Sequence, residues 1–377
     1  MGKRGNGEGG ITRHKKSGLY MARYTVQTAA GPKRKTVYGK TRKEAAEKLT
    51  KAMADGDGGL VFDARNQTVG EYLDRWLKDS VRGSVKPVTF ENRQQLVHNH
   101  IALSLGRIKL KNLTPAHVQG LYRAKLDAGL APSSVRLLHS VLHKALKQPG
   151  RWELVPRNVC EAVDPPKLQT EEIQALDAEQ AKALLEAARG DCLEALYVLA
   201  ITAGLRIGEL LGLKWEDVDL ERRVLNVRRT LSAAKSGPTF TTPKNNKGRS
   251  IKLTERAVDA LKIHKAAQNT QRLKLPADLW EDWQLVFPTR RGTPLGYRNL
   301  TSRSFKSLLS RAELPQTVRF HDLRHTCATL LLSRGVHPKL VQELLGHATI
   351  AMTLDRYSHV LPGMGDQTAT AMESALS

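Results

Sequence analysis

The sequence predicts a multidomain protein that is mainly α-helical and contains small β elements. Its 377 residues exceed one ordinary domain and suit two or three. Hydrophobic residues make up 40% of the chain and aromatic residues only 5%, so the cores should be aliphatic. Stretches rich in Leu and Ala recur at helical spacing, whereas β-branched stretches are short and confined to two regions.

The chain carries a large excess of positive charge. Its 60 Lys and Arg residues against 37 Asp and Glu residues give a net charge of +23. This indicates a polyanionic partner, because phosphate neutralisation and counterion release dominate nucleic-acid affinity. Membrane-surface binding would need a basic amphipathic helix with a Trp or Phe face, and the sequence contains none. We therefore expect a nucleic-acid partner and no membrane.

Cysteine usage indicates a reducing compartment. Cys160, Cys192 and Cys327 are odd in number and far apart, which favours buried thiols over disulfides or a zinc site. No apolar stretch approaches membrane-spanning length, and the Gly-rich polar start does not resemble a secretory signal. We expect a cytoplasmic, nucleoid-associated protein of a prokaryote.

Residues 1–60 are predicted to form a small basic sheet backed by one helix. They carry 14 Lys or Arg residues against 5 Asp or Glu residues. Residues 19–26 and 33–38 have the aromatic and β-branched content of strands. Thr41 and Glu44 form a capping box that begins a helix. Such a sheet could be a plain capping module, but its basic strands favour contact with a DNA groove.

Residues 66–162 are predicted to form a domain of four helices. A linker of alternating Asp and Gly precedes them, and a second capping box, Thr68 with Glu71, begins the first helix. The other helices start near Thr89, at Thr114-Pro115 and near Pro132-Ser133. Their apolar stripes should form the core, and the basic residues between them suit either a solvated face or a DNA-binding face.

Residues 170–377 are predicted to form a third domain that is mostly helical with a short β patch. A Pro-rich break at residues 163–167 precedes it, and Asp177 with Gln180 caps its first helix. The elements predicted next are helices 193–203 and 206–213, strands 224–227 and 249–253, and a helix from Glu255.

Patterns for ATP or metal chemistry are missing from the sequence. It contains no GxxxxGK[ST] loop, HExxH motif or paired CxxC, and no acidic clusters suited to two-metal nucleases. We therefore expect no cofactor and no metal. A DNA-acting enzyme of this kind must stabilise a pentacoordinate phosphorus with cationic side chains.

Arg206 is the first candidate for such a side chain. It follows the turn at Gly204 and stands at the start of an apolar helix. An equally simple interpretation makes Arg206 a buried ion-pair partner of Glu209, three residues on.

Two later segments add candidates. His321 and Arg324 are three residues apart and so share a helix face. His347 follows a helix that ends at Gly346, and Tyr357 lies ten positions further on. Each of these motifs is weak by itself, since an isolated His or Tyr is usually structural.

Together the segments GLRIGELLGL, HDLRHTCATLLLSRG and VQELLGHATIAMTLDRYSHV resemble the tyrosine recombinase family in motif, order and spacing. The family pattern is Arg, a hairpin Lys, His-x-x-Arg, His or Trp, and Tyr. The resemblance implies these catalytic residues: Arg206, Lys244, His321, Arg324, His347 and Tyr357. The hairpin of residues 242–249 also contains Lys247, and Lys244 is chosen because the family lysine usually precedes the turn. Lys244 is implied to protonate the departing 5′-oxygen.

The resemblance implies strand transfer without metal or ATP. Tyr357 would attack the scissile phosphate to leave a 3′-phosphotyrosine and a free 5′-hydroxyl. Arg206 and Arg324 would stabilise the charge of the transition state. His321 would act as acid or base toward the nucleophile, and His347 would hydrogen-bond the phosphate.

The three-part layout resembles phage-type integrases, with an arm-binding domain at residues 1–60 and a helical core-binding domain at 66–162. It implies site-specific integration and excision at double-stranded DNA attachment sites by a homotetramer, with accessory DNA-bending or directionality proteins as further partners. The tail of residues 366–376 could dock on a neighbouring catalytic domain or pack on its own.

Three alternatives differ in what they require. A catalytically silent DNA-binding regulator would lack a catalytic residue, and all six are present. A type IB topoisomerase-like nicking-closing enzyme would share the chemistry but would not need the basic N-terminal domain. A metal-dependent nuclease built on the His residues would lose activity in EDTA.

Overall fold

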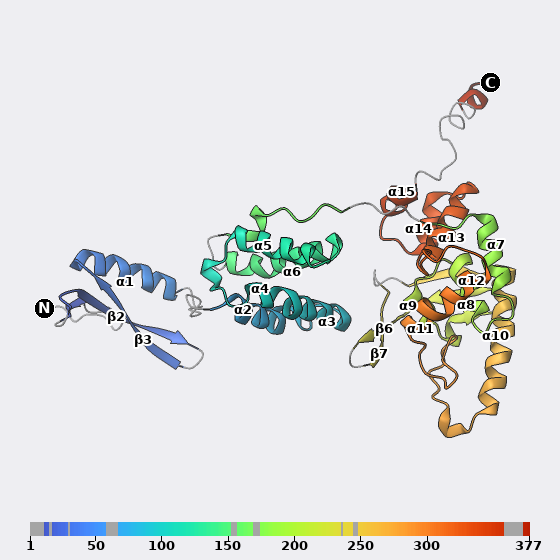
Figure 1. The fold of residues 1–377 in the computed structure, drawn as a ribbon, viewed down its shortest axis with the longest axis horizontal. Coiled ribbons are helices and arrows are strands. Elements are labelled where there is room, and N and C mark those ends of the chain that lie inside the picture. Colours follow the sequence, from blue (N-terminus) through green and yellow to red (C-terminus); the bar gives the residue numbers. More distant parts are fainter. Residues whose placement is uncertain are drawn as a thin grey trace. The chain divides into compact units, whose positions relative to one another are not determined.

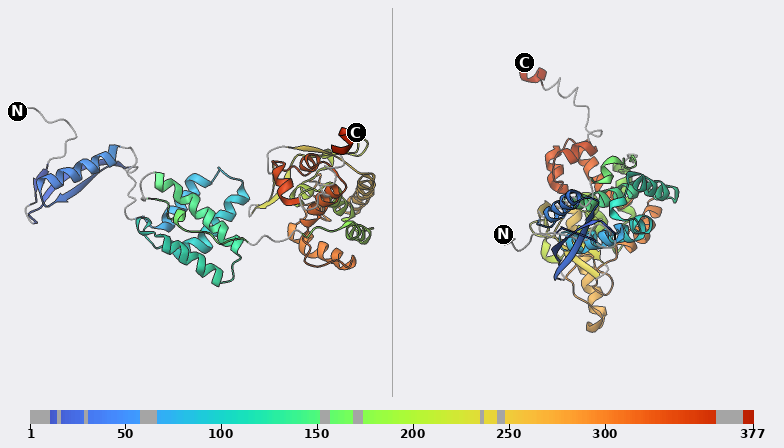
Figure 2. Two further views of the ribbon diagram at one scale, coloured as in Figure 1. Left: turned by 90° about the horizontal axis from the view of Figure 1, so that it is seen from above. Right: turned by 90° about the vertical axis from the view of Figure 1, so that its left-hand side faces the viewer.

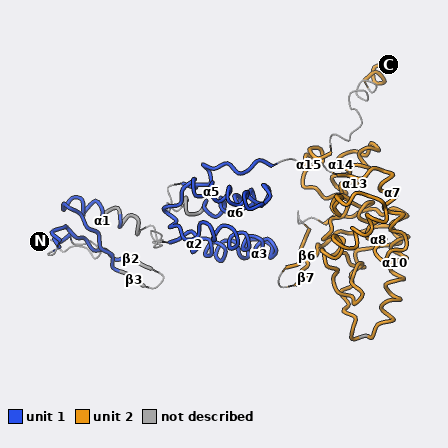
Figure 3. The backbone as a smooth tube through the Cα atoms, in the orientation of Figure 1, with its two compact units in different colours: residues 1–169 blue, residues 170–377 orange. Residues whose placement is uncertain are grey.

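A computed structural model describes residues 11–14, 17–28, 31–57, 67–151, 157–168, 174–234, 237–243, 248–357 and 372–377. The chain divides into two compact units, residues 1–169 and 170–377 (Figure 3). Helices predominate in both and the sheets are small, which confirms the predicted fold class (Figure 1). The three domain ranges given above stay predictions.

The N-terminal part of unit 1 is an antiparallel sheet with one helix packed on it. The strands are β1 (Ile11–Arg13), β2 (Tyr20–Thr28) and β3 (Gly31–Gly39), in the order β1-β2-β3. Helix α1 (Arg42–Asp57) lies on β2 and β3, where Ala22 and Ala45 are fully buried. The Thr41 hydroxyl caps α1 by accepting the Glu44 N–H at 3.1 Å. Both predicted strands and the helix are confirmed, and β1 is an addition.

Four helical rods make up the rest of unit 1, as the sequence predicts. They are α2 (Val69–Trp76) with the π turn η1 (Leu77–Val81); α3 (Pro87–Leu96) with the π turn η2 (Val97–Ile101) and α4 (Ala102–Leu105); α5 (Pro115–Asp127); and α6 (Pro132–Arg151). Two short 3-10 helices, η3 (Leu110–Asn112) and η4 (Val159–Ala162), complete it. The predicted capping box is present, because the Thr68 hydroxyl accepts the Glu71 N–H at 3.3 Å. Apolar residues at helical spacing, among them Leu73 and Leu138, are fully buried between the rods.

Unit 2 begins with helices and two small sheets. The helices are α7 (Ala178–Ala187), α8 (Glu194–Thr202), α9 (Ile207–Leu211) and the 3-10 helix η5 (Trp215–Asp217). The first sheet has the order β4 (Val218–Asp219), β5 (Val224–Val227), β8 (Arg249–Lys252), and the second pairs β6 (Thr230–Ala234) with β7 (Gly237–Thr241). The pairing of β5 with β8 matches the predicted β patch, whereas β4 and the β6–β7 pair are additions.

The second half of unit 2 is helical. Its elements are α10 (Glu255–Lys274), η6 (Ala277–Leu279), α11 (Tyr297–Asn299), η7 (Leu300–Ser304), α12 (Phe305–Arg311), α13 (Asp322–Ser333), α14 (Pro338–Leu345) and α15 (Ala351–Tyr357). Helix α8 is the centre of the core, buried from Ala195 to Ile201 and in contact with α7, α9, α10 and α13. Helices α13, α14 and α15 pack together (Figure 2).

The cysteines differ in exposure. Cys160 and Cys327 are buried free thiols, but Cys192 is exposed, so the prediction of three buried cysteines is wrong for this residue. Cys192 lies in the turn between α7 and α8 rather than on a packed helix face, which leaves its side chain open to solvent. In the part of the chain that the structure describes, no helix combines the length and the apolar character needed to cross a membrane.

Candidate active site

A glycine turn lets three helices meet at the candidate site. Gly204 follows α8 with φ of +58°, and a Cβ there would lie 2.5 Å from a Leu345 methyl and 3.2 Å from the Cys327 sulfur. Only glycine tolerates both the left-handed backbone and this approach. The turn therefore sets Arg206, at the N-terminus of α9, against α13 and the end of α14.

Arg206 belongs to a buried ionic network. Its backbone N–H and its Nη1 donate to the Glu209 carboxylate, each at 2.9 Å. Arg249, at the start of β8, donates to the same carboxylate through Nη1 at 3.0 Å and Nη2 at 2.7 Å. Glu209 is 2% exposed, and despite this burial the two arginines lower its pKa to about 2. Arg206 is therefore an ion-pair partner of Glu209, although its side chain is 24% exposed rather than buried, and its catalytic role stays a prediction. Arg249 is a partner that sequence reasoning missed.

Three arginines converge on the C-terminus of α14. The carbonyl of Leu344 accepts from Arg249 Nε at 2.7 Å, that of Leu345 from Arg324 Nη2 at 2.6 Å, and that of Gly346 from Arg206 Nη2 at 3.2 Å. The last carbonyls of a helix lack partners within it and carry partial negative charge, which guanidinium groups satisfy. Gly346 ends the helix with φ of +65°, as its predicted role requires.

Arg324 is the most enclosed of these cations. It is 3% exposed, and its Nη1 donates to the Gly204 carbonyl at 2.7 Å. Burial, with Arg206 nearby, lowers the pKa of Arg324 to about 9, so the group stays charged at neutral pH. Arg324 thus connects the turn before α9 with the end of α14 and concentrates positive charge at this corner.

His347 is oriented by the helix that carries the candidate nucleophile. Its Nδ1 lies 2.9 Å from the hydroxyl of Thr353, a fully buried residue on α15. Burial and the cations Arg324 and Arg206 lower the pKa of His347 to about 4. The imidazole is therefore neutral in the DNA-free protein, and its Nε2 points away from the Thr353 contact.

Tyr357 is buried at the end of α15 beside a second histidine of α13. It is 1% exposed, and its hydroxyl lies 2.5 Å from His325 Nδ1. Burial raises the pKa of Tyr357 to about 12, although Arg324 opposes the shift. Burial and the neighbouring His321 lower the pKa of His325 to about 4. Sequence reasoning missed His325; its place one helical turn beyond His321 was the signal available.

His321 stands at the N-terminus of α13 and is exposed. Its ring meets the His325 ring edge to face, with centroids 5.0 Å apart. Partial burial and Arg324 lower its pKa. Within the described part of the chain its ring nitrogens make no hydrogen bond, so they are available to a ligand.

The structure thus brings five of the six predicted residues together: Arg206, His321, Arg324, His347 and Tyr357. The sixth, Lys244, and its alternative Lys247 lie outside the described residues. Described residues flank this segment on both sides, and Arg249, which follows it, reaches into the ionic network.

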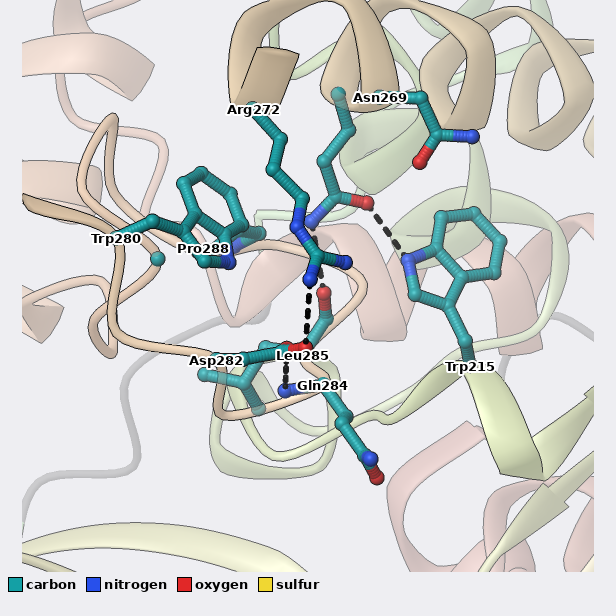
Figure 4. A pocket seen from close by; sticks show the side chains of 10 residues that line it. Trp215, Asn269, Arg272, Trp280, Asp282, Gln284, Leu285 and Pro288 are labelled. Atoms are coloured by element: carbon teal, nitrogen blue, oxygen red, sulfur yellow. Dashed lines mark hydrogen bonds and ion pairs between the residues drawn. The ribbon is translucent and has the colours of Figure 1, made fainter. Parts of the chain in front are cut away.

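A separate pocket lies between α10 and the segment that follows η6 (Figure 4). Its lining residues include Trp215, Arg272, Trp280 and Asp282, and none of the candidate residues. Arg272 and Asp282 form an ion pair across it at 3.5 Å. Among the described residues no cluster of His, Cys, Asp and Glu could hold a metal ion.

Comparison with known proteins shows which family the chain matches. Residues 174–363 match the phage integrase family, and residues 68–126 match the phage integrase N-terminal SAM-like domain. A tyrosine recombinase XerC-like protein of Caldanaerobacter subterraneus subsp. tengcongensis is 34% identical, over 87% of this chain and 88% of that protein. An integrase of Streptomyces ambofaciens is 30% identical, over 94% of this chain and 93% of that protein.

A solved structure shares the fold. The Tn1549 transposon integrase in complex with a circular intermediate DNA has a TM-score of 0.69 and 22% identity, covering 82% of this chain and 100% of that chain. The present chain belongs to the phage integrase family of tyrosine recombinases, enzymes that cleave and rejoin DNA strands. The predicted class, a site-specific DNA recombinase, is confirmed, and the comparisons support neither the silent regulator nor the topoisomerase alternative.

Proposed function

We propose that this recombinase integrates and excises a phage or other mobile element through a 3′-phosphotyrosine formed at Tyr357. The observation that carries the proposal is the convergence of Arg206, Arg324 and His347 on the end of α14, with Tyr357 on the next helix. Cations and a neutral histidine donor beside a tyrosine are the groups needed to bind a phosphodiester and attack it.

Arg206 and Arg324 would stabilise the negative charge of the phosphodiester and of its transition state. A phosphodiester carries one negative charge, and the pentacoordinate transition state gathers more on its non-bridging oxygens. Guanidinium groups held in place before the DNA arrives stabilise that increase at no reorganisation cost. His347, fixed through Nδ1 by Thr353, would donate from Nε2 to the same oxygens.

The nucleophile has to lose a proton that its surroundings retain. Burial favours the neutral phenol of Tyr357, so the proton must leave as the bond to phosphorus forms. The family pattern gives this exchange to His321, which touches His325, and His325 in turn touches Tyr357.

Protonation of the leaving 5′-oxygen is assigned to Lys244, with Lys247 as the alternative, on the family pattern alone. A substrate with a bridging phosphorothiolate at the cleavage site distinguishes the roles of the two lysines, because a sulfur leaving group needs no proton. We expect this substrate to restore cleavage by Lys244→Ala, while Lys247→Ala cleaves ordinary DNA normally. The reverse pattern would assign the role to Lys247.

The proposed partners are double-stranded attachment sites and three further copies of the chain. Exchange of four strands between two duplexes requires four nucleophiles, hence a homotetramer on DNA. Residues 66–162 would bind the core site and residues 1–60 the arm sites, with residues 170–377 catalysing strand transfer. Accessory DNA-bending or directionality proteins complete the proposal.

The decisive experiment uses a nicked suicide duplex that carries the attachment core, incubated in EDTA with wild type and with Tyr357→Phe. Denaturing gels report any covalent protein–DNA adduct. We expect an adduct with wild type only, which would identify the nucleophile and dispose of a metal-dependent nuclease. Binding of a verified site without an adduct would refute the proposal.

A further inference from the structure

His325 has no role in the family pattern, yet it is the side chain that touches the candidate nucleophile. Its Nδ1 lies 2.5 Å from the Tyr357 hydroxyl, and the ring centroids are 5.7 Å apart. Both side chains are almost fully removed from solvent, at 5% and 1% exposure. A contact this short between two buried polar groups fixes the direction of the phenolic O–H.

The phenol is the donor in this contact. Tyr357 keeps its proton because burial raises its pKa, and in the described part of the chain His325 is the one hydrogen-bond partner of its hydroxyl. A buried hydroxyl hydrogen without an acceptor is costly, so it points to His325. The imidazole is neutral and has one bare nitrogen, which this arrangement places at Nδ1.

We infer that His325 accepts the phenolic proton of Tyr357 during cleavage and returns it during religation. The inference deepens the proposed function and rests on it. In cleavage the Tyr357 O–H bond breaks and His325 Nδ1–H forms, while the Tyr357 oxygen bonds to phosphorus. The bond from phosphorus to the 5′-oxygen breaks, and that oxygen takes a proton from the acid of the site.

Religation reverses each change. The oxygen of the incoming 5′-hydroxyl bonds to phosphorus and gives its proton to the group that had protonated it in cleavage and is now deprotonated. The bond from phosphorus to the Tyr357 oxygen breaks, and that oxygen takes the proton held on His325. One imidazole thus serves both directions, and no proton need be exchanged with solvent between them.

The placement of His321 differs in a way that matters. Its ring meets the His325 ring edge to face, no hydrogen bond joins it to the Tyr357 hydroxyl among the described residues, and the residue is exposed. His321 can therefore bind the phosphate or set the orientation of His325, whereas His325 alone is within hydrogen-bond distance of the reacting oxygen among the described residues.

The test removes each histidine in turn and then makes the phenol more acidic. His325→Ala and the matched control His321→Ala are each prepared with Tyr357 and with difluorotyrosine at position 357, whose phenol ionises near neutral pH. Single-turnover cleavage of the suicide duplex is measured alongside DNA binding. We expect His325→Ala to slow cleavage about 10²- to 10⁴-fold, the range for a lost general base. Difluorotyrosine should bring the cleavage rate of His325→Ala most of the way back to that of wild type, and it should leave the slow cleavage by His321→Ala unchanged.

His325→Gln distinguishes proton transfer from positioning, and it replaces the alanine variant should that fail to bind DNA. Glutamine can accept the phenolic hydrogen bond but cannot take the proton, so cleavage should stay as slow as in His325→Ala. Recovery to near the wild-type rate would show that His325 only holds the hydroxyl, and would overturn the inference. Rescue of His321→Ala by difluorotyrosine, without rescue of His325→Ala, would also overturn it.

The Tyr357→Phe control distinguishes a failure of this inference from a failure of the proposed function. If Tyr357→Phe still forms the adduct, the proposed function fails and the inference fails with it. If Tyr357→Phe is inactive but His325→Ala cleaves at the wild-type rate, only the inference fails.

Discussion

The Thr353 hydroxyl and the Nδ1 atom of His347 lie 2.9 Å apart, so the helix that carries the proposed nucleophile also orients the histidine that we propose binds phosphate. Thr353 is fully buried on α15, one helical turn before Tyr357. Docking of α15 therefore completes two parts of the site together. A displacement of α15 as a whole would therefore move Thr353 together with Tyr357 and break the contact with His347.

Replacing Thr353 with Val tests this link. The substitution keeps the shape but removes the hydroxyl, so His347 can rotate and its Nε2 no longer faces the phosphate. We expect single-turnover cleavage to fall by about 10²-fold, as for a small misplacement of a reacting group, with DNA affinity unchanged. Thr353→Ser retains the hydroxyl and should cleave almost normally. Equal rates for the Val and Ser variants would show that the contact has no catalytic role.

Glu209 should be essential to the stability of unit 2. Glu209→Gln removes the charge of a side chain that is 1% exposed and leaves Arg249, whose side chain is 11% exposed, without its charge partner. Breaking a buried pair in this way costs about 3–5 kcal/mol, which urea unfolding would detect. The control is Glu186→Gln, whose carboxylate is 52% exposed and also pairs with arginine. We expect the control to change stability by at most about 1 kcal/mol.

The shifted pKa values predict acid sensitivity. Folding lowers the pKa of His325 and His347 from 6.5 to about 4, so the unfolded chain binds more protons in that interval. Stability is then fully present above pH 6.5 and is lost as the pH falls toward 4. The pKa of Glu209, lowered from 4.5 to about 2, extends the loss below pH 4.5. Urea midpoints measured across this range check the trend.

A His325→Gln, His347→Gln double variant is the control for that trend, because neither replacement titrates. Its stability should vary less with pH between 6.5 and 4 than that of wild type. An unchanged pH profile would mean that other groups cause the acid sensitivity.

The open face of the N-terminal sheet should contact arm DNA. Ala22 faces α1, so its neighbour Arg23 faces the other way, and Arg34, opposite Thr25 in the register, shares that open face. We expect Arg23→Gln with Arg34→Gln to weaken arm-site binding and to reduce the salt-dependence slope by about 1 per lost phosphate contact. Cleavage of a core-only duplex should be unaffected. Lys43→Gln on α1 is the control, and an equal effect there would indicate a general charge effect.

Residues 372–376 are helical and offer apolar side chains for docking. Met372 and Leu376 are 60% and 81% exposed. If the tail docks on a neighbouring protomer, deleting residues 366–377 or changing both side chains to Ser should abolish tetramers on DNA. Light scattering of the protein–DNA complexes would show this. Glu373→Gln should leave assembly intact, and tetramers formed by the deletion variant would eliminate docking between protomers.

Local patterns made much of the fold predictable. The capping boxes at Thr68 and Asp177 and the glycine that ends α14 depend on residues within one helical turn, and each is found where the sequence places it. The residues of the candidate site could be proposed from the sequence for the same reason, because the motifs that contain them are short. Helical periodicity likewise located the buried stripe of α6 correctly.

Contacts between distant segments were not predictable. Arg249 reaches Glu209 across 40 positions, and His325 reaches Tyr357 across 32. Nothing in the periodicity of either segment specifies such partners, because packing of whole helices determines them. The β6–β7 pair was missed because the stretch Thr230–Ala234 lacks the alternation typical of a half-buried strand. The exposure of Cys192 depends in the same way on which turn surrounds it.

The arginine side chains that contact the end of α14 are already ordered in the folded protein. Each guanidinium has five N–H groups. Arg324 donates from Nη1 and Nη2 to two carbonyl oxygens. Arg206 donates from Nη1 to a carboxylate and from Nη2 to a carbonyl oxygen. In the proposed function the remaining N–H groups are the ones that would donate to phosphate oxygens, while the existing contacts hold the side chains in place. Their conformational entropy is therefore lost when the protein folds, so if they bind the DNA phosphate as proposed, the affinity is not reduced by ordering these side chains.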